Sequence, residues 1–77
     1  MLKANIKLNS IDKVKEFVNI ASNHIEDIDL MSGKYIIDAK SIMGIFSLDL
    51  SKSIDLNIHS ENKVDEILDR LAPFIVD

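Results

Sequence analysis

The chain has 77 residues, of which 47% are apolar and 29% are charged, and its formal net charge is −4. This length allows one hydrophobic core, so we expect a single domain over residues 1–77 with the composition of a folded rather than a disordered protein. The acidic balance and the absence of a lysine cluster argue against nucleic acid as a partner, and leave a protein or a small molecule.

Targeting and metal-binding features are missing from the sequence. No apolar run approaches the ~20 residues that a membrane span requires, and the N-terminus has no apolar segment of the kind found in signal peptides. We therefore expect a cytoplasmic protein without a membrane segment. The chain has no cysteine, and its two histidines, His24 and His59, are far apart. We expect neither a metal site nor a cofactor.

The first part of the chain predicts a strand followed by a helix. Residues 2–8 alternate apolar and polar side chains, which is the period of a strand with one buried face. Asn9 or Ser10 can cap a helix that ends near Ser22, so about one residue would separate the strand from the helix. The apolar residues of this helix, which we expect to face the core, are Ile11, Val14, Phe17, Val18 and Ala21.

The middle of the chain predicts a hairpin and a short helix. Residues 26–31 and 35–39 have strand patterns and are separated by Ser32-Gly33, which favours a turn. Ser41 then occupies the position of a helix N-cap before residues 42–46, a segment that is too short and too apolar to form a solvated helix. We expect a short helix at the surface.

The last part predicts a fourth strand and a final helix. Residues 54–59 alternate again, and a helical pattern begins at about Lys63. Pro73 should weaken or kink the last turn of this helix. Its expected apolar stripe is Val64, Ile67, Leu68, Leu71 and Phe74.

These elements follow the order βαββαβα. One-sided alternation in the strands predicts an α+β fold in which helices cover one face of a four-stranded antiparallel sheet. Ferredoxin-like modules that bind small molecules share much of this order, so the pattern leaves the function open. Such a module would need a glycine-rich ligand loop, whereas the chain has only Gly33 and Gly44.

The segment KSIMGIFSL, from Lys40 to Leu48, resembles the regulatory-serine segment of the histidine-containing phosphocarrier (HPr) family in low-GC Gram-positive bacteria. Phe17-Val18 and Ala21-Ser22 are similar to the middle of the family's first helix. Residues 54–58 and the acidic final helix extend the resemblance over most of the chain. The resemblance implies an open-faced β-sandwich with the element order predicted above.

The chain departs from the family at the active-site sequence Gly-Ile/Leu-His-Ala-Arg-Pro-Ala, which opens the family's first helix. Counting back from Phe17-Val18 puts the phosphorylated histidine at about Ser10, the arginine at Asp12 and the proline at Lys13. A serine without a base is a poor nucleophile, and an aspartate would repel phosphate. We expect no catalytic residue, and we interpret Ser10 as a helix cap. In this respect the chain is similar to the catabolite-repression paralogue of HPr, which also lacks the histidine.

The two histidines do not replace the missing one. His24 lies in the loop after the first helix and His59 at the end of the fourth strand, so neither follows the family's active-site sequence. We interpret both as solvated surface residues.

Two interpretations of Ser41 remain open. It can serve only as a helix cap, worth about 1 kcal/mol. It can also be a regulatory site, because the amides at a helix start favour a phosphate. In the resembling proteins, HPr kinase phosphorylates the matching serine, and the phosphorylated form binds a catabolite-repression transcription regulator.

Ile42, Met43 and Phe46 either complete the core or form a partner-binding surface. The resemblance implies the second role, in which this patch docks onto enzymes and regulators. The leading hypothesis is a non-enzymatic, protein-binding regulatory module of the phosphotransferase system or of carbon catabolite regulation, as a monomer or weak dimer. Its expected partners are HPr kinase/phosphorylase, a transcription regulator or phosphotransferase-system enzymes. The alternative is a phosphocarrier of that system that uses a non-standard residue.

Overall fold

The computed structural model describes the backbone of residues 2–76 and the side chains of residues 4–76. The predicted order βαββαβα is confirmed, with one 3₁₀ turn (η1) added at the end. The elements are β1 (Leu2–Ile6), α1 (Ile11–Ser22), β2 (Asp27–Ser32), β3 (Tyr35–Asp38), α2 (Ile42–Phe46), β4 (Ile54–His59), α3 (Val64–Leu71) and η1 (Ala72–Phe74). None of the helices in this part of the chain is long and apolar enough to cross a membrane.

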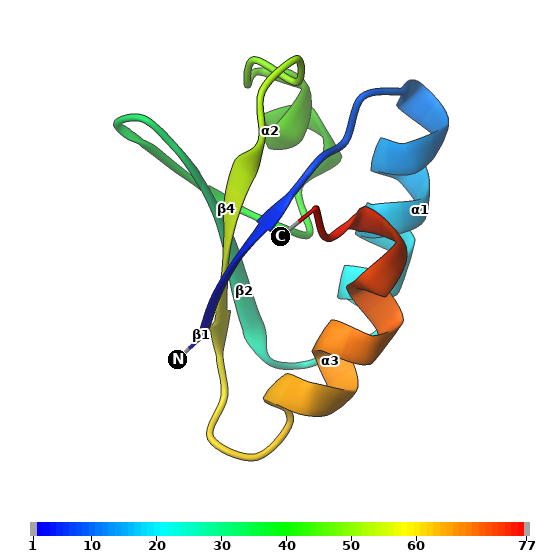
Figure 1. Ribbon diagram of the computed structural model, residues 1–77, viewed down its shortest axis with the longest axis vertical. Coiled ribbons are helices and arrows are strands. Elements are labelled where there is room, and N and C mark those ends of the chain that lie inside the picture. The colour runs from blue at the N-terminus through cyan, green and yellow to red at the C-terminus, as the bar shows by residue number, and fades with distance from the viewer. Residues whose placement is uncertain (1, 77) are drawn as a thin grey trace.

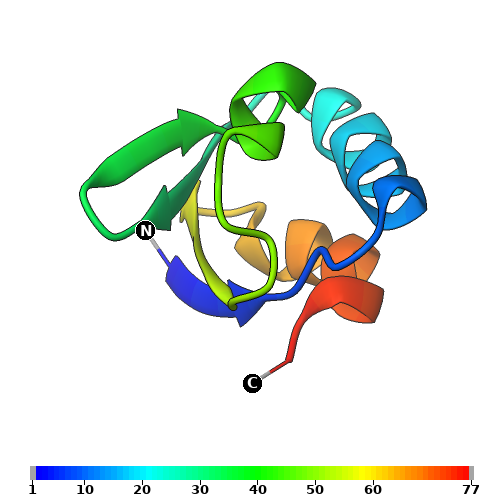
Figure 2. The ribbon, with the colours of Figure 1, turned by 90° about the horizontal axis from the view of Figure 1, so that it is seen from above.

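The four strands form one antiparallel sheet in the order β1-β4-β2-β3. The helices cover one face of this sheet and leave the other face open (Figures 1 and 2). The predicted α+β architecture, an open-faced β-sandwich, is therefore confirmed. β4 and β2 are the central strands, while β1 and β3 lie at the two edges.

The core lies between the sheet and the helices, as the alternating pattern predicts. The rings of Phe17 on α1 and Phe74 in η1 meet edge to face there, with centroids 5.6 Å apart and planes at 90°. Apolar residues from one face of the strands pack beneath them. These residues are Ile6, Ile28, Leu30, Ile54, Leu56 and Ile58. Leu2, which we also expected on this face, lies outside the residues whose side chains the structure describes.

The connection between β1 and α1 is longer than predicted. β1 ends at Ile6, its last partner of β4, and residues 7–10 lead to the helix. Leu8 continues the alternating pattern and is fully buried, but its backbone does not belong to the strand. The alternation outlasts the strand because Leu8 packs into the core from the connection itself.

One predicted core residue lies at the surface. Ile11 is 61% exposed, whereas Val14, Phe17 and Ala21 on the same helix are buried. Ile11 is the first helical residue, and helical side chains are tilted toward the helix N-terminus. Its side chain therefore lies beyond the part of α1 that packs on the sheet.

The hairpin between β2 and β3 turns at Gly33 and Lys34. β2 begins and ends one residue later than predicted, and β3 ends one residue earlier. Gly33 has a φ of 62°. A two-residue turn with positive φ at only its first central position matches the type II′ hairpin, which favours glycine there.

The C-terminal segment lies beside the end of β1. α3 ends at Leu71, and the chain continues through η1, which contains Pro73 as predicted. The Lys7 amide donates to the Phe74 carbonyl, and the Val76 amide donates to the Asn5 carbonyl, both at 2.9 Å.

Candidate functional site

Ser10 begins α1 and acts as its N-cap. Its backbone is extended, with φ −149° and ψ 158°, and its Oγ accepts a hydrogen bond from the Lys13 amide at 3.2 Å. Its carbonyl accepts from the Val14 amide at 3.1 Å. Within residues 4–76, no base is hydrogen-bonded to this hydroxyl. Ser10 therefore satisfies the helix start, and nothing in the described part of the chain activates it as a nucleophile.

Ser41 has the same role at the start of α2. Its Oγ accepts from the Gly44 amide at 3.2 Å, and its carbonyl accepts from the Ile45 amide at 3.1 Å. The turn before it is held by Asp38, whose carbonyl accepts from the Ser41 amide at 3.0 Å. Ser41 is only partly buried, and so is the hydrogen bond that its hydroxyl accepts.

Two features fix α2 against the rest of the molecule. Ile45 is fully buried in the core. Gly44 lies against β3, where a Cβ built on it would come within 2.6 Å of Cγ2 of Ile37. Together they determine which face of this five-residue helix is turned outward.

Met43 and Phe46 are on the outward face of α2. Met43 is 77% exposed and Phe46 is 41% exposed, and residues three apart on a helix are neighbours on its surface. Ile42 differs from them, because it is partly buried and packs against the core. Of the three residues predicted as a partner surface, two are therefore exposed, and the third faces the core in part.

An open hollow of about 550 Å³ joins α2 to the start of α1. It is lined by Asn9, Ser10, Ile11, Phe46, Leu50 and Ser51. Ile11, Phe46 and Leu50 are its large apolar lining residues, and Met43 is exposed on α2 three residues before Phe46. We call these four residues the α1–α2 patch. The sequence patterns do not predict Ile11 or Leu50 as surface site residues. The helical pattern assigns Ile11 to the core, and Leu50 lies in the loop before β4, where no periodic pattern applies.

The loop that carries Leu50 is held by a local hydrogen-bond pair. Asp49 Oδ1 accepts from the Ser51 hydroxyl at 2.6 Å and from the Ser51 amide at 3.1 Å. The hydroxyl bond first and the amide bond second lower the pKa of the Asp49 carboxyl below its ordinary value, with a further contribution from the nearby Lys52 charge. Asp49 thus helps to position Leu50 in the patch.

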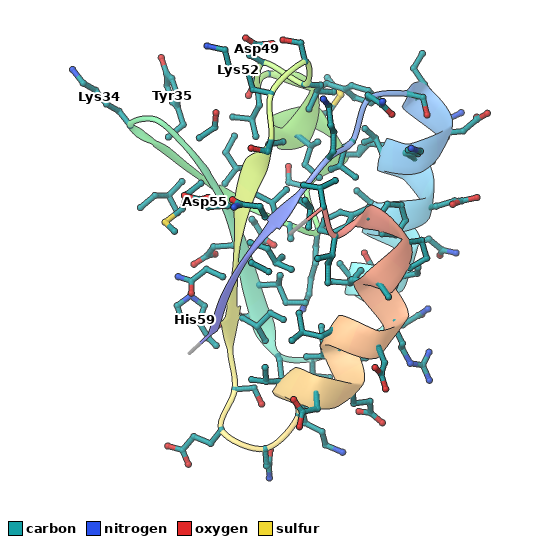
Figure 3. All side chains as sticks on the ribbon, viewed as in Figure 1. Lys34, Tyr35, Asp49, Lys52, Asp55 and His59 are labelled. Carbon is teal, nitrogen blue, oxygen red and sulfur yellow. The ribbon has the colours of Figure 1, made fainter. Side chains whose placement is uncertain are left out.

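Both histidines lie away from the α1–α2 patch. His59 is exposed, as interpreted from the sequence, although it also contacts an aspartate. His59 Nε2 is 2.7 Å from Oδ2 of Asp29 on the neighbouring strand β2. His59 lies at the end of β4 (Figure 3). His24 is partly buried, and its Nε2 has no hydrogen-bond partner within residues 4–76. Across the same residues, no group of three potential ligand side chains could hold a metal ion.

Solved structures with the same architecture were found. HPr-C-His from Thermoanaerobacter tengcongensis matches with a TM-score of 0.79 and 25% identity, over 95% of this chain and 89% of that chain. The phosphocarrier protein HPr of Bacillus anthracis str. Ames matches with a TM-score of 0.74 and 23% identity, over 97% and 96% of the two chains. The chain has the HPr fold.

A third match is Crh, the catabolite repression containing protein of Bacillus subtilis, whose structure is a domain-swapped dimer. Its TM-score to this HPr-like chain is 0.65 at 29% identity, over 92% of this chain and 79% of Crh. No family model and no curated protein matches the sequence.

The start of α1 in this HPr-like chain carries Ser10, Ile11 and Asp12, with no histidine among them. His24 follows the C-terminal end of α1, so the twelve residues of this helix separate it from Ser10. The α1–α2 patch therefore lies beside a helix start that has backbone amides and a capping hydroxyl but no imidazole.

Proposed function

We propose that this chain is an HPr-like regulatory module that acts in the cytoplasm by binding proteins and does not carry phosphate on a histidine. The observation that supports the proposal is the combination at one surface of an exposed apolar patch and a helix start without a nucleophile. Ile11 and Phe46 present large apolar groups beside Ser10, and Met43 is exposed on α2 three residues before Phe46. Such groups are enriched at the centres of protein interfaces.

The chemistry at the start of α1 opposes a phosphocarrier role. Transfer through histidine needs an imidazole, amides that receive the phosphate, and a cation that offsets its charge. Ser10 supplies only a hydroxyl that caps the helix, and Asp12 adds a negative charge to the first turn. The imidazole nucleophile is thus missing, and an acid stands at the position that matches the family's arginine.

Phosphorylation of Ser41 is the proposed switch. A phosphate there would carry about −1.5 to −2 charges and could accept hydrogen bonds from the first-turn amides, in place of the present bond between Oγ and the Gly44 amide. The added charge would lie two residues from Met43 and five residues from Phe46 in the sequence. The phosphate would add an anionic group at the border of the apolar patch. This added charge would change which partners the patch can bind.

The similarity to HPr proteins and to Crh directs the proposal to the phosphotransferase system and to carbon catabolite regulation. The proposed partners are HPr kinase/phosphorylase, a transcription regulator, or enzymes of that system. The chain itself catalyses no reaction in this proposal.

The experiment is incubation with HPr kinase and ATP, followed by intact-mass analysis and peptide mapping. The proposal expects one phosphate, located on Ser41, and none on the Ser41→Ala variant. Ser47→Ala is the matched control, because Ser47 lies at the other end of α2, and it should be labelled like the unsubstituted chain. No label, in a mixture where an HPr protein is labelled, would refute the Ser41 switch.

A further inference from the structure

The two edge strands of the sheet, β1 and β3, differ in what lies beside them. At the edge formed by β1, the C-terminal segment occupies the last two residues of the strand, through the bridge between Ile6 and Ile75 and the hydrogen bond from the Val76 amide to the Asn5 carbonyl. Within residues 2–76, β3 pairs only with β2. An open edge presents unpaired backbone groups to any strand that approaches it.

The side chains at the β3 edge also favour association. Tyr35 is 69% exposed and Ile36 is 70% exposed, an unusual pair for an edge strand that stays unpaired. The only proline of the chain is Pro73, so the edge is not blocked by a residue without an amide hydrogen. The hairpin extends away from α1 and α3 (Figure 2).

The register of the hairpin determines which backbone groups face outward. Ser32 and Tyr35 flank the two-residue turn and form a hydrogen-bonded pair, and such pairs alternate along an antiparallel ladder. Tyr35 and Ile37 therefore bond to β2. The N–H and C=O of Ile36 and the N–H of Asp38 point to the free side, while the Asp38 carbonyl accepts from the Ser41 amide.

We propose that β3 pairs antiparallel with β3 of a second copy of this chain, with each Ile36 opposite the Ile36 of the other copy. In this register, each Ile36 amide donates to the other Ile36 carbonyl, and each Asp38 amide donates to the other Lys34 carbonyl. The two open sheets join edge to edge without any exchange of segments.

Charge complementarity selects this register. With Ile36 opposite itself, Lys34 of each copy is opposite Asp38 of the other, so the apolar pair is flanked by two pairs of opposite charge. Lys34 and Asp38 are both exposed, and the side chain of Lys34 extends from the tip of the hairpin (Figure 3). A shift by two residues would instead put Lys34 or Asp38 opposite Ile36.

The dimer should be weak, because the paired strand has four residues and the contact falls below the roughly 1,000 Å² that stable interfaces bury. It uses no residue of the α1–α2 patch. If the β3 pairing fails its test, the proposed function is therefore unaffected. If the proposed function fails its test, the β3 pairing is likewise unaffected.

The test is sedimentation equilibrium of the chain and of two charge variants, Lys34→Asp and Asp38→Lys, over roughly 20 μM to 2 mM, a range chosen for a weak interface. Each variant alone places like charges opposite each other twice, so its dimer should be about tenfold weaker. In an equimolar mixture of the two variants, every facing pair is again of opposite sign, so dimers should form as readily as in the unsubstituted chain. Thermal unfolding of each variant verifies that it is folded.

Recovery in the mixture, together with slower hydrogen exchange of the Ile36 amide at high concentration, would support the pairing. The proposal is overturned if the unsubstituted chain stays monomeric over the whole concentration range. That result is expected if the β3 edge binds a different protein. It is also overturned if single variants dimerise like the unsubstituted chain, or if their mixture does not recover.

Discussion

Gly44 on α2 and Ile37 on β3 pack so closely that a Cβ at Gly44 would lie 2.6 Å from Cγ2 of Ile37. The same Cβ would be 3.1 Å from the Ser41 hydroxyl oxygen. The absence of a side chain at position 44 thus lets α2 lie flat against β3 with its cap in place. The contact sets the position of the outward-facing Met43 and Phe46.

Gly44→Ala should therefore destabilise the protein, although alanine is the better helix former. The overpacking cost is about 1 to 3 kcal/mol, against a gain of up to about 1 kcal/mol in helix propensity. The measurement is urea unfolding of Gly44→Ala, Ile37→Ala and the double variant. Because Ile37→Ala removes the clashing methyl, the two changes should couple by at least about 0.5 kcal/mol. Additive effects would mean that α2 can shift without cost.

Phe17→Ala should cost about 3 to 5 kcal/mol of unfolding free energy. Phe17 is fully buried, and its ring meets Phe74 edge to face, so truncation leaves a cavity and removes an aromatic contact. This is a large share of the total stability of a small domain. Ile11→Ala on the same helix is the control, with an expected change within about 0.5 kcal/mol. A loss below about 1 kcal/mol for Phe17→Ala would contradict the described core.

Truncations on α2 should separate folding from binding. Met43→Ala should change stability by less than about 0.5 kcal/mol, because Met43 is 77% exposed. Ile45→Ala should cost about 2 to 5 kcal/mol, since Ile45 is fully buried. If the α1–α2 patch is a binding surface, Met43→Ala or Phe46→Ala should weaken capture by HPr kinase at least about 30-fold, the equivalent of about 2 kcal/mol. Unchanged affinity in both variants would remove the patch from the interface.

The pKa of Asp49 gives a prediction for low pH. Bonds from the Ser51 hydroxyl and amide lower this pKa in the folded state. The stabilisation is therefore present above the pKa of the unfolded chain, and it is lost as the pH falls through the lower folded value. Carbon-detected NMR titration should find the pKa of the Asp49 carboxyl below its ordinary value, and Ser51→Ala should move that pKa upward. An ordinary pKa that Ser51→Ala leaves unchanged would show that the loop is not held by this pair.

The sequence predicts most of the fold because burial is one-sided and periodic. Ile54, Leu56 and Ile58 alternate along β4, and Pro73 marks the end of regular helix as expected. Alternation does not report where pairing stops, so Leu8 was assigned to a strand that ends at Ile6. Alternation also does not show which side chains the neighbouring strands will bury. Asn57 is one of the polar residues in the alternating pattern of β4, yet it is only 7% exposed, whereas Asp55 and His59 on the same face are exposed.

The site was harder to predict, because it combines segments that are distant in sequence. The local pattern around Ser41 was sufficient to predict its cap and the exposure of part of α2. Ile11 and Leu50 join Phe46 only through the tertiary packing of α1 beside α2. Helical periodicity assigned Ile11 to the core, since a period of 3.6 residues does not show that the first residue of a helix extends beyond its packed face.

The central claim is that this HPr-like chain does not carry phosphate on a histidine. Incubation with phosphoenolpyruvate and enzyme I, followed by intact-mass analysis at neutral pH, tests this directly, with a phosphocarrier HPr in the same tube as the positive control. We predict that the control gains one phosphate and that the mass of this chain is unchanged, because Ser10 and Asp12 stand at the helix start instead of a nucleophile and a cation. An acid-labile gain of one phosphate that disappears in a His24 or His59 variant would contradict the proposal.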